Sequence, residues 1–196
     1  MDKKKEEVKP PMLGEEAVPS FGDKVVEVNL DLSNIPCKID GLKLNLGCGG
    51  DVKNGYLNVD KYDSRADANW DISKKLPLHD NSVTQVVSFS VLEHFSQTKA
   101  LEILKEWSRV IKKGGNLVLI VPDMVSACER YLRDPEDEWS LARIYGHQGA
   151  KGQFHKAGFT PKKLFSLFGR AGFIEIQIAY FNEPNGVREI YVNGYK

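Results

Sequence analysis

The sequence predicts a single-domain α/β protein, built on a doubly wound, mostly parallel sheet with a C-terminal antiparallel hairpin. From Leu42 onward, short apolar runs alternate with helical stretches, a pattern typical of parallel strands covered by helices. Near the C-terminus, two β-rich segments flank the turn-rich residues Asn182–Gly186. These two strands should pair antiparallel, because a parallel return needs a crossover of about a dozen residues or more.

Six short runs have the length and the apolar or alternating composition of strands. These predicted strands are Leu42–Leu46, Tyr56–Val59, Gln85–Ser90, Asn116–Val121, Ile174–Tyr180 and Arg188–Val192. A further segment, Lys24–Leu32, alternates apolar and polar residues as a half-buried strand does. Because it precedes the rest of the pattern, we expect it to be an edge or accessory strand.

Three segments carry helical periodicity or capping signals. The predicted helices are Gln97–Lys112, Val125–Leu132 and Pro161–Gly169. Ser96 is the expected N-cap of the first helix and Gly114 its terminator, and Thr160 is the expected N-cap of the third. The aromatic run Trp139–Tyr145 could line a cavity or pack in the core, and the core placement is favoured.

Composition divides the chain into three parts. Residues 1–20 mix charge with prolines and have too few apolar groups to offset the entropy of ordering. We therefore expect a flexible charged tail there, an accessory strand segment over residues 21–40, and one domain over residues 41–196.

Charge and cysteine content exclude several classes of protein. Lys plus Arg and Asp plus Glu both number 27, so net charge indicates no nucleic-acid or membrane partner. No apolar run approaches the roughly 18 residues that span a bilayer, and the N-terminal residues lack the apolar stretch of a signal peptide. The three cysteines are widely spaced and suggest no disulfide framework. A cytoplasmic location is therefore expected, and the oligomeric state stays open.

A glycine turn follows the first strand of the predicted domain. In Leu44–Gly50, an apolar strand runs directly into Gly-Cys-Gly-Gly, where glycine permits positive φ and close approach of a ligand to the backbone. The next strand ends in Asp60. Ligands of doubly wound folds lie across the carboxyl ends of the strands, and an acid at such a tip accepts hydrogen bonds from ribose hydroxyls.

At these residues the sequence resembles the class I S-adenosylmethionine-dependent methyltransferases, in particular those of glycan and cell-surface polysaccharide biosynthesis. The resembling stretches are LNLGCGG (44–50), GYLNVD (55–60), LPLHDNS (76–82), VLEHF (91–95), RVIKKGG (109–115) and VPD (121–123), with looser matches at HKAGF (155–159) and AGF (171–173). The resemblance implies a Rossmann-like fold and a methyltransferase domain over residues 41–196.

The resemblance also implies roles for single residues of a cofactor site. S-adenosylmethionine would bind at the glycine turn, with Gly47 and Gly49 facing its methionine moiety and Cys48 fitting between them as a small residue. Asp60 would hold the ribose.

Three further residues are implied in the same site. Asp71 would accept a hydrogen bond from the adenine amino group, although a turn or N-cap role ahead of Ile72 stays open. Phe89 and Ser90 would line the methionine side. The chain departs from the family between Gly50 and Tyr56, where the usual first helix must shrink to about one turn.

A hydroxyl acceptor requires a base, and three candidates lie near the expected strand ends. His94 follows the third of these strands, Asp123 the fourth, and His155 lies in the glycine-rich segment 146–158, which we expect to be a loop over the site. His155 is favoured, while Glu93 and His94 could instead brace the next helix. No cluster of carboxylate, His or Cys ligands suggests a metal.

Three functions stay open. The first is methyl transfer to a small-molecule or glycan acceptor, most simply at a hydroxyl. The second is a nicotinamide-dependent oxidoreductase, which the valine at position 52 disfavours because G-x-G-x-x-G requires glycine there. The third is a cofactor-binding scaffold or partner subunit that performs no chemistry.

Overall fold

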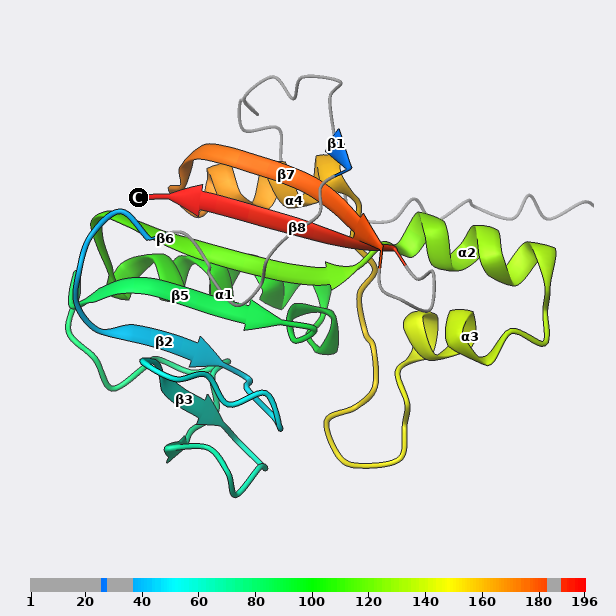
Figure 1. The fold of residues 1–196 in the computed structure, drawn as a ribbon, viewed down its shortest axis with the longest axis horizontal. Coiled ribbons are helices and arrows are strands. Elements are labelled where there is room, and N and C mark those ends of the chain that lie inside the picture. The colour runs from blue at the N-terminus through cyan, green and yellow to red at the C-terminus, as the bar shows by residue number, and fades with distance from the viewer. Residues whose placement is uncertain (1–25, 28–36, 183–187) are drawn as a thin grey trace, which may run out of the picture.

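The computed structural model describes residues 26–27, 37–182 and 188–196. These residues form one eight-stranded sheet with the order β1-β7-β8-β6-β5-β2-β3-β4 (Figure 1). Its strands are β1 Val26–Glu27, β2 Lys43–Leu46, β3 Leu57–Asp60, β4 Ala68–Asn69, β5 Val83–Phe89, β6 Ile111–Pro122, β7 Ile174–Asn182 and β8 Arg188–Tyr195. The helices are η1 Leu92–His94, α1 Gln97–Val110, α2 Met124–Arg133, α3 Glu138–Tyr145 and α4 Pro161–Arg170.

The sheet is parallel except at β8, which confirms the predicted fold class. Strands β4, β3, β2, β5 and β6 pair in parallel, whereas β8 is antiparallel to both β6 and β7. The predicted C-terminal hairpin is therefore β7 and β8. The residues between them, 183–187, lie outside the described residues, as does the predicted tail over residues 1–20.

The predicted accessory strand is described only at Val26–Glu27, which pairs in parallel with β7 at the edge of the sheet. Residues 24–25 and 28–32 of that prediction lie outside the described residues. None of the described helices has the length and apolarity that crossing a bilayer requires.

Local signals located the helix starts correctly. Ser96 caps α1 by accepting from the Lys99 amide, and Thr160 caps α4, which has proline in its first turn. Helix α1 ends two residues earlier than predicted, at Val110, because the next residue already pairs with Val83 as the start of β6. The predicted terminator Gly114 therefore lies within β6.

One face of the sheet carries the main core. Helices α1 and α4 lie side by side on this face (Figure 1), where Trp107 of α1 and Phe168 of α4 are fully buried. A smaller cluster that includes Val87 and Val118 is built by neighbouring strand positions, whose side chains point to the opposite face.

The predicted core placement of Trp139–Tyr145 is wrong. Helix α3, which contains this run, packs against α2, and the two helices project beyond the end of the sheet (Figure 1). Trp139 and Tyr145 are 48% and 55% exposed. The aromatic composition suggested burial, but no sheet surface lies over this helix pair.

The link between β2 and β3 contains turns and no helix, which confirms that the usual first helix is reduced. Side-chain hydrogen bonds hold this link in its place. The buried amide of Asn45 donates to the carbonyl of Asp51 at 2.7 Å and to Asn58 Oδ1 at 3.0 Å. Asn58 Oδ1 in turn accepts from the Lys53 amide at 2.8 Å. Strands β2 and β3 thereby lie side by side with their carboxyl ends at one edge.

Candidate active site

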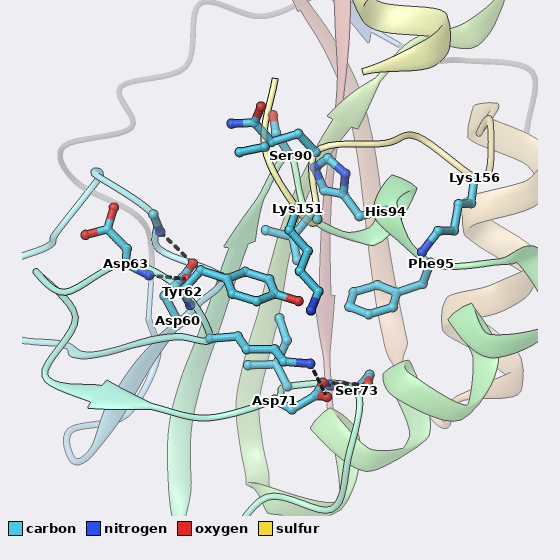
Figure 2. A pocket seen from close by; sticks show the side chains of 18 residues that line it. Asp60, Tyr62, Asp63, Asp71, Ser73, Ser90, His94, Phe95, Lys151 and Lys156 are labelled. Carbon is cyan, nitrogen blue, oxygen red and sulfur yellow. Dashed lines mark hydrogen bonds and ion pairs between the residues drawn. The ribbon is translucent and has the colours of Figure 1, made fainter. Parts of the chain in front are cut away.

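A cavity of about 640 Å³ lies at the carboxyl ends of β2, β3 and β5 (Figure 2). Eighteen residues line it: Gly47, Gly49, Asp60, Lys61, Tyr62, Asp63, Asp71, Ile72, Ser73, Ser90, Val91, His94, Phe95, Ala150, Lys151, Gly152, Gln153 and Lys156. The predicted loop over residues 146–158 indeed contributes to its wall. A Cβ added at Gly152 of this loop would lie 2.9 Å from the Tyr62 ring, so the loop approaches the β3 end closely.

The glycine turn has the conformation that its sequence predicts. Gly47 and Gly49 have φ of +72° and +48°, and the amides of Gly47 and Cys48 both donate to the carbonyl of Val59. A Cβ added at Gly49 would meet nothing within 4 Å. A ligand can therefore approach the backbone here, which fits the expected contact with the methionine part of S-adenosylmethionine.

Gly47 is expected to tolerate no side chain. A Cβ there would lie 2.5 Å from Cγ2 of the buried Val91, so Gly47→Ala adds overpacking of about 1–3 kcal/mol to a left-handed conformation that costs about 1–2 kcal/mol. Gly55→Ala is the matched control, since its φ is +78° with open space around it. Urea unfolding should show a clearly larger loss for Gly47→Ala, and equal losses would contradict the close contact.

Asp60 is held at the tip of β3 by main-chain donors. Its Oδ1 accepts from the amides of Tyr62 and Asp63 at 2.7 and 3.0 Å, and its Oδ2 accepts from the Gly49 amide at 3.0 Å. A carboxylate oxygen accepts two hydrogen bonds, so Oδ2 keeps one position for a ligand hydroxyl. The fixed carboxylate lines the cavity, as a ribose-binding acid requires.

Asp71 both forms a turn and lines the cavity. Its Oδ1 accepts from the amide and hydroxyl of Ser73, and its Oδ2 pairs with Lys61 at 2.9 Å. The Ser73 hydroxyl and then Lys61 lower the pKa of Asp71 to about 2. The turn interpretation left open by the sequence is therefore correct, and the predicted contact with adenine stays a prediction.

Of the remaining predicted cofactor residues, only Ser90 lines the cavity. Ser90 follows β5 directly with φ of +52°. Phe89 packs against the small cluster on the opposite face of the sheet, because successive strand residues point to opposite faces. Cys48 is buried, and burial raises the pKa of its thiol to about 11, as suits a small residue that fits the turn.

His94 lines the cavity, whereas His155 and Asp123 do not. Nδ1 of His94 donates to the carbonyl of Phe154 at 3.1 Å. A carbonyl can only accept, so Nε2 of the neutral ring keeps its lone pair. Burial lowers the pKa of His94, which favours this neutral form.

Asp123 has a structural place. Its Oδ1 caps α2 by accepting from the Val125 amide at 3.1 Å, and its Oδ2 accepts from Nε of Arg188 at 2.6 Å. Because the side chain is fully buried at the α2 start and both oxygens are engaged, Asp123 is the least accessible of the three predicted base candidates.

His155 lies behind His94. The two rings meet edge to face, with 4.9 Å between their centroids, and Nδ1 of His155 donates to the carbonyl of Arg143 at 2.8 Å. Its Nε2 lies 4.0 Å from Oε1 of Glu93. The side chain of His155 is only 8% exposed, and burial lowers its pKa.

Glu93 completes this group, and the structure corrects the expectation that no such ligands cluster. Glu93, His94 and His155 each offer one potential metal-ligating atom within 4.8 Å of the others. Glu93 is 1% exposed, and burial raises the pKa of its carboxyl to about 8. The sequence did not reveal the cluster because His155 joins it from a distant loop.

The sequence also missed several polar residues of the cavity wall. Three of them, Lys61, Tyr62 and Asp63, directly follow Asp60 at the end of the same strand. The predicted strand therefore already indicated that they would lie near the cavity. Lys151 and Lys156 come from the covering loop, and neither forms an ion pair with another described residue. Figure 2 shows Lys151 reaching into the cavity between Tyr62 and Phe95. These lysines give the side away from Asp60 a positive charge.

One family model matches a segment of this chain. Residues 55–119 match the family model of a methyltransferase domain. Comparison with curated protein sequences gave no match. The matched segment runs from the turn before β3 into β6 and so includes Asp60, Asp71 and His94.

Three solved structures of similar fold are described as S-adenosylmethionine-dependent methyltransferases. The one from Archaeoglobus fulgidus is 16% identical, with 80% of this chain and 86% of that chain covered and a TM-score of 0.58. The one from Methanosarcina mazei is 21% identical, with 80% and 92% covered and a TM-score of 0.58. The one from Thermotoga maritima is 17% identical, with 81% and 83% covered and a TM-score of 0.57.

These matches confirm the predicted fold class. Residues 55–119 match a methyltransferase domain, and the chain has the fold of the solved S-adenosylmethionine-dependent methyltransferases. S-adenosylmethionine is the cofactor of this class, and the glycine turn with the open space at Gly49 fits it.

Proposed function

We propose that this domain transfers a methyl group from S-adenosylmethionine to a hydroxyl oxygen of a small-molecule or saccharide acceptor. One observation carries the proposal: a single cavity has the glycine turn and Asp60 on one side and the imidazole of His94 on the other (Figure 2). Cofactor and acceptor can therefore meet in one space, and positioning of this kind supplies much of the rate of a displacement.

The residues of the cavity divide into two groups by position. Gly47, Gly49 and Asp60 form the cofactor side, where main-chain atoms and one carboxylate are fixed by hydrogen bonds. His94 and the loop with Lys151 form the acceptor side. S-adenosylmethionine supplies an electrophilic methyl group on sulfur, and its carbon–sulfur bond breaks with the electron pair left on sulfur. The acceptor oxygen forms the new bond to the methyl carbon, and Nε2 of His94, a residue of the cavity wall, takes the hydroxyl proton.

The test of the proposal is release of S-adenosylhomocysteine over a panel of acceptors. Because Lys151 and Lys156 give the acceptor side positive charge, the panel contains sugar nucleotides and acidic saccharides beside neutral glycans and small phenols. Turnover with a hydroxyl acceptor, and its absence with the O-methylated product, is the expected result. Cofactor binding without turnover on any acceptor would favour the non-catalytic scaffold, and tighter binding of NADH than of S-adenosylmethionine would favour the oxidoreductase.

Asp60→Ala is expected to weaken S-adenosylmethionine binding by about 1.5–3 kcal/mol, the typical loss of hydrogen bonds to a charged acceptor. Isothermal titration calorimetry measures it. Asp51→Ala is the matched control, because Asp51 is exposed, lies in the same link and does not line the cavity. Asp60 also accepts from the Gly49 amide, so the melting temperature of each variant is measured too. Unchanged affinity in a folded Asp60→Ala variant would refute the role of Asp60.

A further inference from the structure

Two segments bring Glu93, His94 and His155 together. Glu93 and His94 lie in η1 after β5, and His155 lies in the loop between α3 and α4. Main-chain hydrogen bonds fix this loop on η1, since the amides of Lys156 and Ala157 donate to the carbonyl of Glu93 at 2.7 and 3.1 Å. The juxtaposition is therefore built into the backbone and does not depend on side-chain rotation alone.

Both imidazoles are oriented in the manner of metal ligands. Nδ1 of His94 donates to the carbonyl of Phe154 and Nδ1 of His155 to the carbonyl of Arg143, at 3.1 and 2.8 Å. Metal-binding histidines almost always hold their second ring nitrogen in this way, which fixes the tautomer. Each Nε2 then carries a lone pair, and that of His155 points toward Glu93.

The Glu93 carboxylate has no hydrogen-bond partner among the described residues, although the side chain is almost fully buried. Removing a carboxylate from water without a partner is costly. The nearby cation Arg143 already pairs with another buried carboxylate, Glu189, at 3.0 Å. A positive ion at Glu93 would give both carboxylate oxygens the partner that they lack among the described residues.

We propose that Glu93, His94 and His155 bind one divalent transition-metal ion, with zinc as the first candidate and an open coordination position toward the cavity. Two imidazoles and one glutamate are a ligand set of catalytic zinc sites, and imidazole favours zinc or iron over magnesium and calcium. Ligands about 2.1 Å from one ion lie at most about 4.2 Å apart. The potential ligand atoms of the three residues lie within 4.8 Å of one another. The two atoms farthest apart therefore need to approach each other by roughly half an ångström when the ion binds.

The ion has a consequence for methyl transfer, and this part rests on the proposed function. His94 lines the cavity, so an acceptor hydroxyl can take the open coordination position. A metal-bound hydroxyl loses its proton to water at lower pH than a free one, which yields the nucleophilic oxygen. In the metal-bound form Nε2 of His94 is a ligand of the ion, and in the metal-free form it takes the hydroxyl proton as proposed above. Because His155 belongs to the covering loop, the same ion fastens that loop over the acceptor.

The binding test uses full-length, tag-free protein after dialysis against EDTA, titrated with zinc against a chromophoric chelator. One ion per chain is expected. Loss of a residue that only orients a ligand typically weakens binding about 10–100-fold, so Glu93→Gln and His155→Gln, which remove ligands, should each weaken it by at least about 100-fold. His79→Gln is the matched control, since His79 is exposed and outside the cluster, and magnesium chloride should not compete.

Circular dichroism and melting temperatures of the metal-free variants show whether they fold. The absence of stoichiometric zinc binding, or equal affinity in folded Glu93→Gln, would overturn the site. Methyl transfer is measured with and without bound zinc. If zinc binds stoichiometrically but the metal-free enzyme transfers methyl groups at the full rate, the catalytic role of the ion is wrong and the binding site stands. If no acceptor is methylated, the proposed function fails while the zinc titration still decides the site.

Discussion

His94→Gln is expected to lower kcat by about 10²–10⁴-fold, the usual contribution of a general base. The affinity for S-adenosylmethionine should stay unchanged, because His94 lies across the cavity from Asp60 (Figure 2). Glutamine is a suitable replacement, since its amide can still donate to the carbonyl of Phe154 while the imidazole Nε2 is lost. Steady-state kinetics, cofactor titration and melting temperature are measured on one preparation.

Two further variants make this result interpretable. His79→Gln changes an exposed histidine outside the cavity and should retain full kcat. His155→Gln tests the residue that the sequence favoured as the base, which the structure places behind His94. If His94→Gln and His155→Gln each lose less than tenfold in kcat, no histidine of this cluster takes part in the chemistry and positioning alone carries the reaction.

The second large effect concerns stability. Arg143→Met is expected to lower the free energy of unfolding by about 3–5 kcal/mol, because breaking a buried ion pair by removing one partner is strongly destabilising. Glu189 is 1% exposed and Arg143 16% exposed at the side chain, and Arg143 Nη2 lies 3.0 Å from Glu189 Oε1. Burial and the charge of Glu189 raise the pKa of Glu93, whereas Arg143 lowers it, so the loss of Arg143 removes a cation from this acidic pair.

Urea unfolding measures this loss, and the double variant Arg143→Met/Glu189→Met is its control. Replacing both members of a buried pair with apolar residues is often neutral or stabilising, so the double variant should recover most of the stability. Lys38→Met, which breaks an exposed pair with Glu175, should change stability little. A small effect of Arg143→Met would show that water reaches Glu189 or that another cation pairs with it.

Prediction from sequence was accurate where the determining interactions are local. The N-caps Ser96 and Thr160 each accept a hydrogen bond from an amide only three positions later in the chain, and both caps are formed. The end of α1 was placed two residues late, because a partner strand far along the chain decides it: Ile111 pairs with Val83. Local pattern also gave no sign that Trp139 and Tyr145 face solvent, since exposure depends on what packs above a helix.

The sequence by itself determined the fold class and the place of the glycine turn and Asp60 at one edge of the sheet. The glycine turn and Asp60 are short motifs at two strand ends, and parallel strands bring their carboxyl ends to one edge whatever else the chain does. Only the tertiary structure decided which other residues share the cavity with them. It placed His94 in the cavity, turned Phe89 to the opposite face and brought His155 from a distant loop onto Glu93. Contacts between segments about 60 residues apart leave no periodicity in the sequence, because they are fixed by the main-chain bonds of the folded loop.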